Sequence, residues 1–234
     1  MCYSIQTDKN IREMAEYFEA NYSSRTEEFF LSQNSKAKIP GNDNRVFKNY
    51  YAPVIINRKG KREIVPLRYN LLPGFCESDK YQFFNQQKKK YEELNTYNAK
   101  IENIERARAY ENLFMNHHCV IPILSFFEWV KQDGKTKEVE FFSESKKTKY
   151  LLAGGVWDHW GPKDLDEGIN SFAIITTPPR VEVEKVGHHR SPLLLKEESI
   201  DKWIRPDKNK NNKNEIYSLI ENNYDEVLEN RFLI

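Results

Sequence analysis

The chain has 234 residues, of which 39% are hydrophobic and 30% charged, which argues against a disordered chain and for a folded protein with a charged surface. Its formal net charge of +1 excludes a uniformly basic protein, so any binding to nucleic acid requires a local patch of Lys and Arg. The first eight residues lack the features of a signal peptide, and no apolar run is long enough to cross a bilayer. We therefore expect a protein of the cytoplasm or nucleoid that makes no membrane contact.

The spacing of apolar residues predicts the elements in chain order. Residues 9–20 have helical spacing and predict a short amphipathic helix, and the polar residues 34–44 predict a loop. Helical spacing returns at residues 101–115, 197–204 and 214–221. We expect strands at 50–56, 62–69, 119–124, 126–130, 139–142, 150–156 and 172–176.

Short strands alternating with long connections determine the expected fold class. The turn-like residues 58–61 contain a glycine, and residues 132–135 have Asp-Gly at their centre, which is typical of a β-hairpin. This pattern predicts an α+β fold with a mainly antiparallel, barrel-like β core and flanking helices. We expect a single domain over residues 1–234, because the most linker-like segment, 208–214, is too near the end to separate two cores.

The cysteine pattern indicates the redox state of the thiols and argues against a zinc site. Cys2, Cys76 and Cys119 form an odd, sparse set, which is typical of free thiols in a reducing compartment and gives no zinc pattern. His118 and Cys119 are neighbours on an expected strand, where adjacent side chains point to opposite faces. We expect no metal and no cofactor. Nothing in the sequence indicates an assembly larger than a monomer.

Cys2 carries the most specific chemistry. If Met1 is removed, Cys2 offers an α-amine and a thiol on adjacent carbons, and the unperturbed amine has a pKa of about 7.7–8.0. Such an aminothiol can condense with an aldehyde, first as a Schiff base and then as a five-membered thiazolidine. An internal cysteine cannot do this, because its nitrogen belongs to an amide. The alternative is that Cys2 is only a small buried residue.

Three further segments contain candidate functional groups. Asn98 could hold a reacting group and Lys100 a phosphate, or Asn98 could cap a helix that begins near residue 101. Glu128 stands among apolar and aromatic residues, where burial would raise its pKa and suit it to proton transfer, unless it faces outward. His188 could act as a general acid or base and Arg190 could bind a phosphate, or both could belong to an exposed basic loop.

Seven segments in this order resemble the SRAP (SOS-response-associated peptidase) family. The family begins Met-Cys and continues with an aromatic-Leu-Ile-Pro segment, an Asn-Ala-Arg-x-Glu segment and a Cys-Leu-Ile-Pro block that ends in Glu-Trp. Ala-Gly-Leu-Trp, Phe-x-Ile-x-Thr-Thr and His-Asp-Arg-Met-Pro segments follow. The matching residues here are 1–2, 69–75, 98–102, 118–129, 153–157, 172–177 and 188–192.

The resemblance implies a barrel-like core with a groove for single-stranded DNA, and a role in DNA repair and the SOS response. Cys2 would be the covalent nucleophile that traps the aldehyde of an abasic site after autocatalytic or assisted loss of Met1. Asn98 would orient the adduct, while Glu128 and His188 would handle protons, including those of a lyase or crosslink-reversal step. Phosphates would contact Lys100 and Arg190, and the disrupted base stack would pack against Leu71, Leu72 and Pro73.

The departures from the family pattern concern DNA contacts more than the covalent chemistry. Ser4 stands where most members have Arg, and Lys100 replaces an Arg, which keeps the charge but loses the bidentate fork. Two alternatives stay open. One is an amidotransferase with an N-terminal nucleophile, although no glutamine-site pattern is present. The other is a non-catalytic module that binds single-stranded DNA.

Overall fold

The computed structural model describes residues 2–32, 37–145, 148–162, 167–205 and 212–233. The helices are α1 (Ile11–Tyr17), α2 (Ser24–Leu31), α3 (Val181–Lys185), α4 (Ile200–Ile204) and α5 (Asn212–Glu221), with the 3-10 turns η1 (Ile101–Asn103) and η2 (Glu197–Ser199). The strands are β1 (Ser4–Gln6), β2 (Asn21–Tyr22), β3 (Arg45–Val46), β4 (Tyr51–Arg58), β5 (Lys61–Tyr69), β6 (Gln82–Asn85), β7 (Lys90–Glu93), β8 (Asn98–Lys100), β9 (His118–Ile123), β10 (Ser125–Gln132), β11 (Lys135–Phe142), β12 (Leu151–Trp160), β13 (Ile169–Thr177), β14 (Ser191–Pro192), β15 (Leu194–Leu195) and β16 (Glu229–Leu233).

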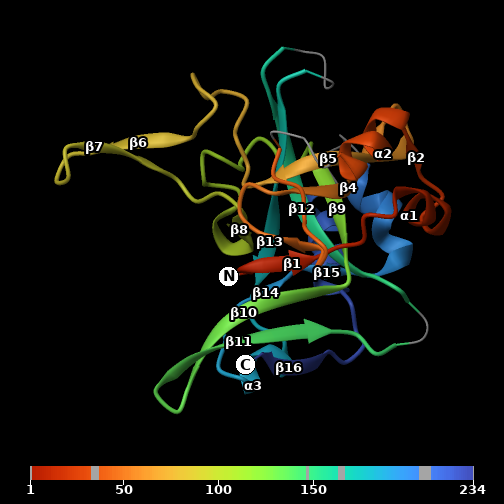
Figure 1. The fold of residues 1–234 in the computed structure, drawn as a ribbon, viewed down its shortest axis with the longest axis vertical. Helices are drawn as coiled ribbons and strands as arrows, with labels where there is room; N and C mark the ends of the chain where they lie inside the picture. Colours follow the sequence, from red (N-terminus) through yellow and green to blue (C-terminus); the bar gives the residue numbers. More distant parts are fainter. Residues whose placement is uncertain (1, 33–36, 146–147, 163–166, 206–211, 234) are drawn as a thin grey trace.

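Five strands close into a barrel, as Figure 1 shows. They run in the order β13-β12-β9-β4-β5, and β5 pairs with β13 again to complete the ring. Every pairing in the ring is antiparallel except that of β5 with β13. Lys59 and Gly60, both with positive φ, form the tight turn between β4 and β5. The expected mainly antiparallel, barrel-like core is confirmed.

A second sheet brings the N-terminus against the barrel. Its strand order is β16-β11-β10-β1-β3, and Asp133 and Gly134 form the predicted hairpin turn between β10 and β11 with positive φ at both residues. Strand β1 is antiparallel to β10, with Ser4 opposite Phe127. The first residues of the chain therefore lie beside the middle of β10.

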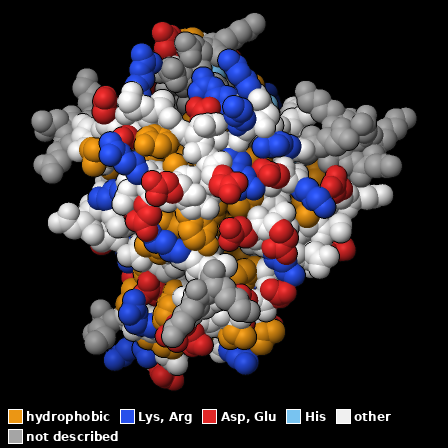
Figure 2. Space-filling view, turned by 90° about the vertical axis from the view of Figure 1, so that its right-hand side faces the viewer, with side chains coloured by type: hydrophobic (Ala, Val, Ile, Leu, Met, Phe, Trp, Pro, Cys, Tyr) orange, Lys and Arg blue, Asp and Glu red, His pale blue; other side chains and the backbone are white. Residues whose placement is uncertain are grey.

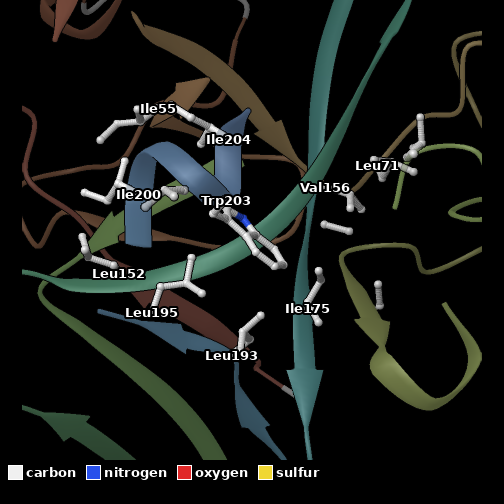
Figure 3. Packing of buried hydrophobic residues seen from close by; sticks show 14 of the residues in the cluster. Ile55, Leu71, Leu152, Val156, Ile175, Leu193, Leu195, Ile200, Trp203 and Ile204 are labelled. Carbon is white, nitrogen blue, oxygen red and sulfur yellow. The ribbon is translucent and has the colours of Figure 1, made fainter. Parts of the chain in front are cut away.

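Two apolar clusters hold these layers together. Figure 3 shows the first, in which Trp203 and Ile200 of α4 pack on Ile55, Leu152 and other residues of the barrel strands. The second cluster joins the barrel to the other sheet; its members include Cys2, Ile5, Phe126, Ile121 and Phe172. Full burial of each large apolar side chain contributes about 1.5–3 kcal/mol. Cys2 is therefore part of the apolar contact between the two sheets.

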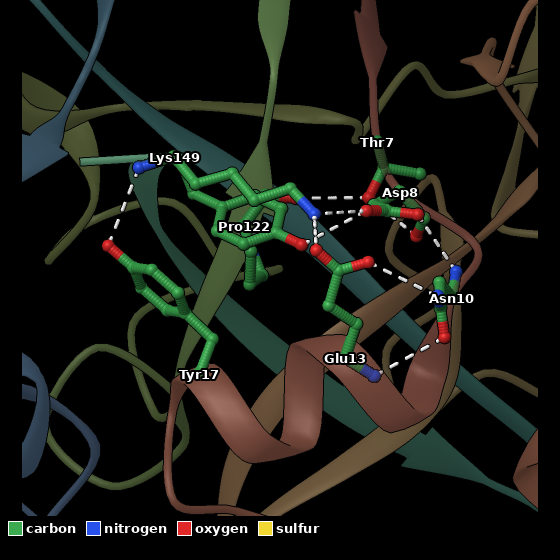
Figure 4. Close-up of polar contacts among 8 residues, drawn as sticks. Thr7, Asp8, Asn10, Glu13, Tyr17, Pro122 and Lys149 are labelled. Carbon is green, nitrogen blue, oxygen red and sulfur yellow. Dashed lines mark hydrogen bonds and ion pairs between the residues drawn. The ribbon is translucent and has the colours of Figure 1, made fainter. Parts of the chain in front are cut away.

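A polar network fixes the chain just after β1 (Figure 4). Thr7 Oγ1 donates to the carbonyl oxygen of Pro122 at 3.0 Å. Lys149 bridges Asp8, at 2.9 Å, and Glu13 of helix α1, at 2.5 Å. Asn10 caps α1 by accepting the backbone N–H of Glu13. The strand that begins near Cys2 is thus anchored at its far end to both β9 and α1.

The structure corrects one predicted helix and adds one hairpin. Residues 101–115 do not form a helix; only the 3-10 turn η1 and irregular turns are present. The predicted apolar face is nevertheless buried, since Ile104, Leu113 and Phe114 belong to the first cluster. Tertiary packing of these side chains has overridden helical propensity. The hairpin β6–β7 was not predicted, while the helices predicted at 9–20, 197–204 and 214–221 appear as α1, η2 with α4, and α5.

Candidate active site

Cys2 lies at the start of the chain segment that enters the protein interior. The backbone N–H of Tyr3 donates to the carbonyl oxygen of Phe127 at 3.1 Å, which extends the pairing of β1 with β10 toward Cys2. The Cys2 side chain is fully buried. Met1, whose removal would free the Cys2 amine, lies outside the described residues.

Two side chains, one from β5 and one from β8, hold the carbonyl group of Cys2. The hydroxyl of Tyr69 donates to this oxygen at 3.1 Å, and Nδ2 of Asn98 donates to it at 2.9 Å. Tyr69 lies opposite Phe172 and Asn98 opposite Ile174, so the two donors stand two positions apart along β13. Burial raises the pKa of Tyr69 well above its ordinary value, so its hydroxyl keeps the proton that it donates. The backbone of Cys2 is therefore held in one orientation.

Glu128 and His188 form a buried acid–base pair. Glu128, on β10, is 1% exposed, and its Oε2 lies 3.3 Å from Nε2 of His188. Nδ1 of His188 lies 2.9 Å from the carbonyl oxygen of Arg190. Because a carbonyl oxygen can only accept, Nδ1 carries a hydrogen and Nε2 faces the carboxyl group. Glu128 faces inward and His188 is buried, so neither residue lies on an outer face or an exposed loop.

Burial favours the neutral form of both members of this pair. It raises the pKa of Glu128 well above its ordinary value and lowers the pKa of His188 to about 4. Burial therefore favours a protonated carboxyl group that faces Nε2 of a neutral imidazole. Burial also raises the pKa of the Cys2 thiol, and a negative charge on Glu128 would raise it further. Burial thus favours the protonated form of both the thiol and the carboxyl group.

Asn98 offers one unused acceptor beside Cys2. Its side chain is 8% exposed, and among the described residues its buried Oδ1 has no hydrogen-bond donor. Asn98 lies in strand β8, and Lys100 takes the N-cap position of η1, so the interpretation of Asn98 as a helix cap is wrong. A buried amide oxygen without a donor costs free energy, which an incoming N–H or O–H group would recover.

The expected phosphate-binding residues differ in their surroundings. Lys100 is exposed. Arg190 is buried and makes a bidentate pair with Glu102, at 2.6 and 3.0 Å, and it also donates to the carbonyl oxygen of Thr176. Its hydrogen bonds hold the pKa of Glu102 below the ordinary value. Lys100 can therefore meet a phosphate directly, whereas Arg190 would first have to leave Glu102.

The expected apolar wedge is buried within the protein. Leu71, Leu72 and Pro73 follow β5 and are all buried, and the backbone N–H of Leu72 donates to Oγ of Ser171 at 2.7 Å. Phe75, two residues further on, is 47% exposed, and the guanidinium of Arg108 lies 4.7 Å from its ring centroid. The aromatic surface that this segment presents to solvent is therefore that of Phe75.

Sequence reasoning missed two residues that shape the site. No local signal marks the hydroxyl of Tyr69 as a donor to Cys2, because barrel closure brings the two residues together. Arg45 donates to Oγ of Ser4 at 2.5 Å, pairs with Glu138 at 2.6 Å and stacks over the ring of Phe127 at 3.8 Å. An arginine from β3 therefore lies beside position 4, where the sequence itself has serine.

His118 and Cys119 also lie next to each other in the sequence, but their side chains do not lie together in one site. His118 stacks on Trp203 in contact with the first cluster, whereas Cys119 belongs to the second, so the two side chains point to opposite faces as expected. Within the described ranges, no three His, Cys, Asp or Glu side chains gather as a metal site requires. None of the described helices combines the length and apolar character needed to span a membrane.

The chain belongs to the SRAP family, because the model of that family, "SOS response associated peptidase (SRAP)", matches residues 1–231. Among solved structures, a Bacteroides thetaiotaomicron protein aligns with a TM-score of 0.71 at 20% identity, covering 100% of this chain and 92% of its own. A Bordetella bronchiseptica protein aligns with a TM-score of 0.70 at 18% identity, covering 100% of both chains. At these identities the likeness shows that the fold is shared.

Several curated relatives carry a functional name. "Abasic site processing protein YoqW" of Bacillus subtilis is 25% identical over 152 residues, which are 65% of this chain and 62% of the relative. "Abasic site processing protein YMR114C" of Saccharomyces cerevisiae is 29% identical over 76% of this chain and 44% of its own. "Abasic site processing protein HMCES" of Gallus gallus is 25% identical over 65% of this chain and 50% of its own. The chain thus matches less than two thirds of the length of these relatives.

Proposed function

We propose that this protein binds single-stranded DNA and traps abasic sites covalently through a thiazolidine at Cys2, after Met1 has been removed. Family membership and the names of the relatives support an abasic site as the substrate. The observation that carries the proposal is the surroundings of Cys2: two donors hold its carbonyl group, and the neutral Glu128–His188 pair lies in the same buried region.

Removal of Met1 would be the first step. Water adds to the carbonyl carbon of Met1, the bond to the Cys2 nitrogen breaks, and that nitrogen takes a proton, which leaves a Met carboxylic acid and a free amine. Glu128 would carry protons in this hydrolysis, because a carboxyl group with a raised pKa can give and take a proton near neutral pH. The result is the aminothiol on which trapping depends.

Crosslinking would then proceed with the loss of one water. Glu128 and His188 assist opening of the deoxyribose to its aldehyde, and the Cys2 amine attacks the aldehyde carbon. The hydroxyl of the adduct takes a proton from Glu128 and leaves as water, which gives an iminium ion and a carboxylate. The thiol sulfur then bonds to the iminium carbon, and its proton returns to Glu128. In reverse, the same proton transfers would open the ring and release the crosslink.

The DNA contacts follow from the positions around this centre. Exposed Lys100 would bind a phosphate next to the lesion, and Arg190 would bind another by exchanging Glu102 for phosphate oxygens. Leu71, Leu72 and Pro73 would support the interrupted base stack, with exposed Phe75 as the ring that meets it. Asn98 Oδ1 would accept a hydrogen from the nitrogen of the adduct.

A crosslinking assay tests this proposal. The protein is incubated with a single-stranded oligonucleotide that carries one abasic site, and the covalent product is separated on a denaturing gel. We expect a product with the wild type and the Cys76→Ala control, none with Cys2→Ala, and none with an undamaged oligonucleotide. A product of normal yield from Cys2→Ala would overturn the proposal.

A further inference from the structure

The hairpin β6–β7 projects from the body of the protein. Its two strands pair only with each other, with Phe84 opposite Tyr91, and form a separate two-stranded sheet. Figure 1 shows this arm extending away from the barrel on the side where the N-terminus lies. An isolated two-stranded hairpin has no core of its own and is marginally stable in water. Packing in a core therefore does not account for the aromatic side chains of this arm.

The arm exposes aromatic rings on both of its faces. Phe84 and Tyr91 share one face, with ring centroids 5.3 Å apart, and they are 51% and 67% exposed. Phe83 lies on the opposite face and is 43% exposed. Exposed aromatic rings that gather in one place indicate a binding surface. Flat rings of this kind can stack with unpaired nucleobases, whatever the sequence of those bases.

The turn of the arm carries positive charge. Lys88, Lys89 and Lys90 follow one another, and between residues 86 and 92 the only acidic residue is Glu92. Glu92 lies 2.9 Å from Nζ of Lys88 and 3.9 Å from Nζ of Lys90, so it offsets only part of this charge. By contrast, the face on the other side of the molecule from the arm has acidic and basic side chains intermixed, as Figure 2 shows. The turn thus combines lysines with stacking rings, as surfaces that bind single-stranded nucleic acid do.

The base of the arm is hydrogen-bonded to a residue that adjoins a donor to Cys2. Glu93 accepts a hydrogen bond from Nδ2 of Asn70 at 3.2 Å and pairs with Lys48 at 3.2 Å. Oδ1 of Asn70 in turn accepts the backbone N–H of Thr96 at 3.0 Å, two residues before Asn98. Asn70 itself follows Tyr69, so these hydrogen bonds join the base of the arm to the two chain segments that carry the donors to the Cys2 carbonyl group.

We propose that the β6–β7 arm is a stacking platform for the unpaired bases that flank a lesion held at Cys2. This inference rests on the proposed function and names a second part of its DNA-binding surface. Phe84 and Tyr91 stack with bases, and the lysines of the turn contact the adjoining phosphates. The arm therefore adds affinity only for oligonucleotides long enough to extend from the site along it.

The test measures binding of fluorescent, undamaged single-stranded oligonucleotides of 8 and 20 nucleotides by anisotropy. The full chain is compared with Phe84→Ala/Tyr91→Ala, with each single variant, and with Leu31→Ala as a control for loss of an exposed apolar side chain, since Leu31 is 70% exposed on α2. We expect the double variant to bind the 20-mer at least about tenfold more weakly, since each stacked base contributes roughly 5- to 150-fold. The 8-mer and the Leu31→Ala control should change less than about twofold.

The outcomes separate this inference from the proposed function. If the wild type binds and crosslinks DNA but the double variant binds the 20-mer as tightly, the arm is not a DNA platform and the proposed function stands. If the wild type binds no single-stranded DNA, both fail. Thermal unfolding, and crosslinking of a separate 8-mer that carries one abasic site, show that each variant is folded. The single variants supply the comparison if the double variant is not folded.

Discussion

Two buried Cys–His neighbourhoods in this protein have the same residue types but different partners. In one, Cys2 lies in the same buried region as Glu128, and His188 Nε2 faces the carboxyl group of that glutamate. In the other, His118 lies with Nδ1 2.9 Å from the carbonyl oxygen of Trp203 and Nε2 next to that of Phe114. The pKa of Cys119 is raised by burial alone.

The difference between the two neighbourhoods lies in what the histidine can exchange. Burial lowers the pKa of both His188 and His118 to about 4, so burial does not distinguish them. His118 faces backbone carbonyl groups, which cannot take or give a proton, and its ring stacks on Trp203 at 4.1 Å. His188 faces a group that titrates. This difference supports our proposal that the first neighbourhood carries chemistry, whereas the second supports the fold.

The largest expected effect comes from Glu128→Gln. The amide keeps the shape of the side chain but cannot transfer a proton, so we expect the crosslinking rate to fall about 100- to 1000-fold. Glu140→Gln is the matched control, because Glu140 is also buried, at 5% exposure, but pairs with Arg231. Rates are measured from gel time courses at saturating DNA. Equal rates for the two variants would remove Glu128 from the mechanism.

Replacing each of the two histidines by Gln tests the comparison of the two neighbourhoods. We expect His188→Gln to slow crosslinking about 100-fold with a small change in stability. His118→Gln should leave the rate within about twofold but lower the free energy of unfolding by about 2–4 kcal/mol, because a buried hydrogen bond and a stacked pair are lost. Denaturant unfolding and the crosslinking assay measure both quantities. The opposite assignment of the two effects would contradict our account.

A smaller effect is expected from Tyr69→Phe, which removes one of the two donors to the Cys2 carbonyl group. The loss of one hydrogen bond should slow crosslinking about three- to tenfold while the affinity for DNA stays unchanged. Tyr224→Phe, which removes a hydroxyl bonded to Ser143, serves as the control. If the rate at saturating DNA is unaltered, the hydroxyl of Tyr69 does not position Cys2.

The last prediction concerns how the free energy of unfolding depends on pH, and it involves the smallest effect on crosslinking. His118 has a folded pKa of about 4, below its unfolded value near 6.5, so its contribution is present above pH 6.5 and is lost as the pH falls toward 4. This loss amounts to at most about 3 kcal/mol. Unfolding measured from pH 7 to pH 4 should show a shallower slope for His118→Gln than for the wild type. Parallel slopes would mean that His118 is not buried in its neutral form.

The structure brings Cys2 and Asn98 together and pairs Glu128 with His188, but the neighbours of these residues could not be predicted from local patterns. Local patterns are sufficient for the seven long strands β4, β5 and β9–β13, for the Asp133–Gly134 hairpin and for the opposite faces of His118 and Cys119. They are insufficient for Tyr69, whose hydroxyl reaches Cys2 only because β5 and β13 close the barrel. The helix predicted at 101–115 is absent, since packing buries Ile104 and Phe114 without regular backbone. The pairing of Arg190 with Glu102 likewise depends on contacts between distant segments.

The central claim is that the mature chain begins with the aminothiol of Cys2 and that this group forms the crosslink. Mass spectrometry of the N-terminal peptide, after reaction with abasic single-stranded DNA and digestion of both components, tests it directly. The account predicts a peptide that starts at Cys2, carries the sugar fragment with the loss of one water, and resists borohydride reduction because the ring is closed. A crosslinked peptide that still contains Met1, or a sugar attached to a lysine, would contradict it.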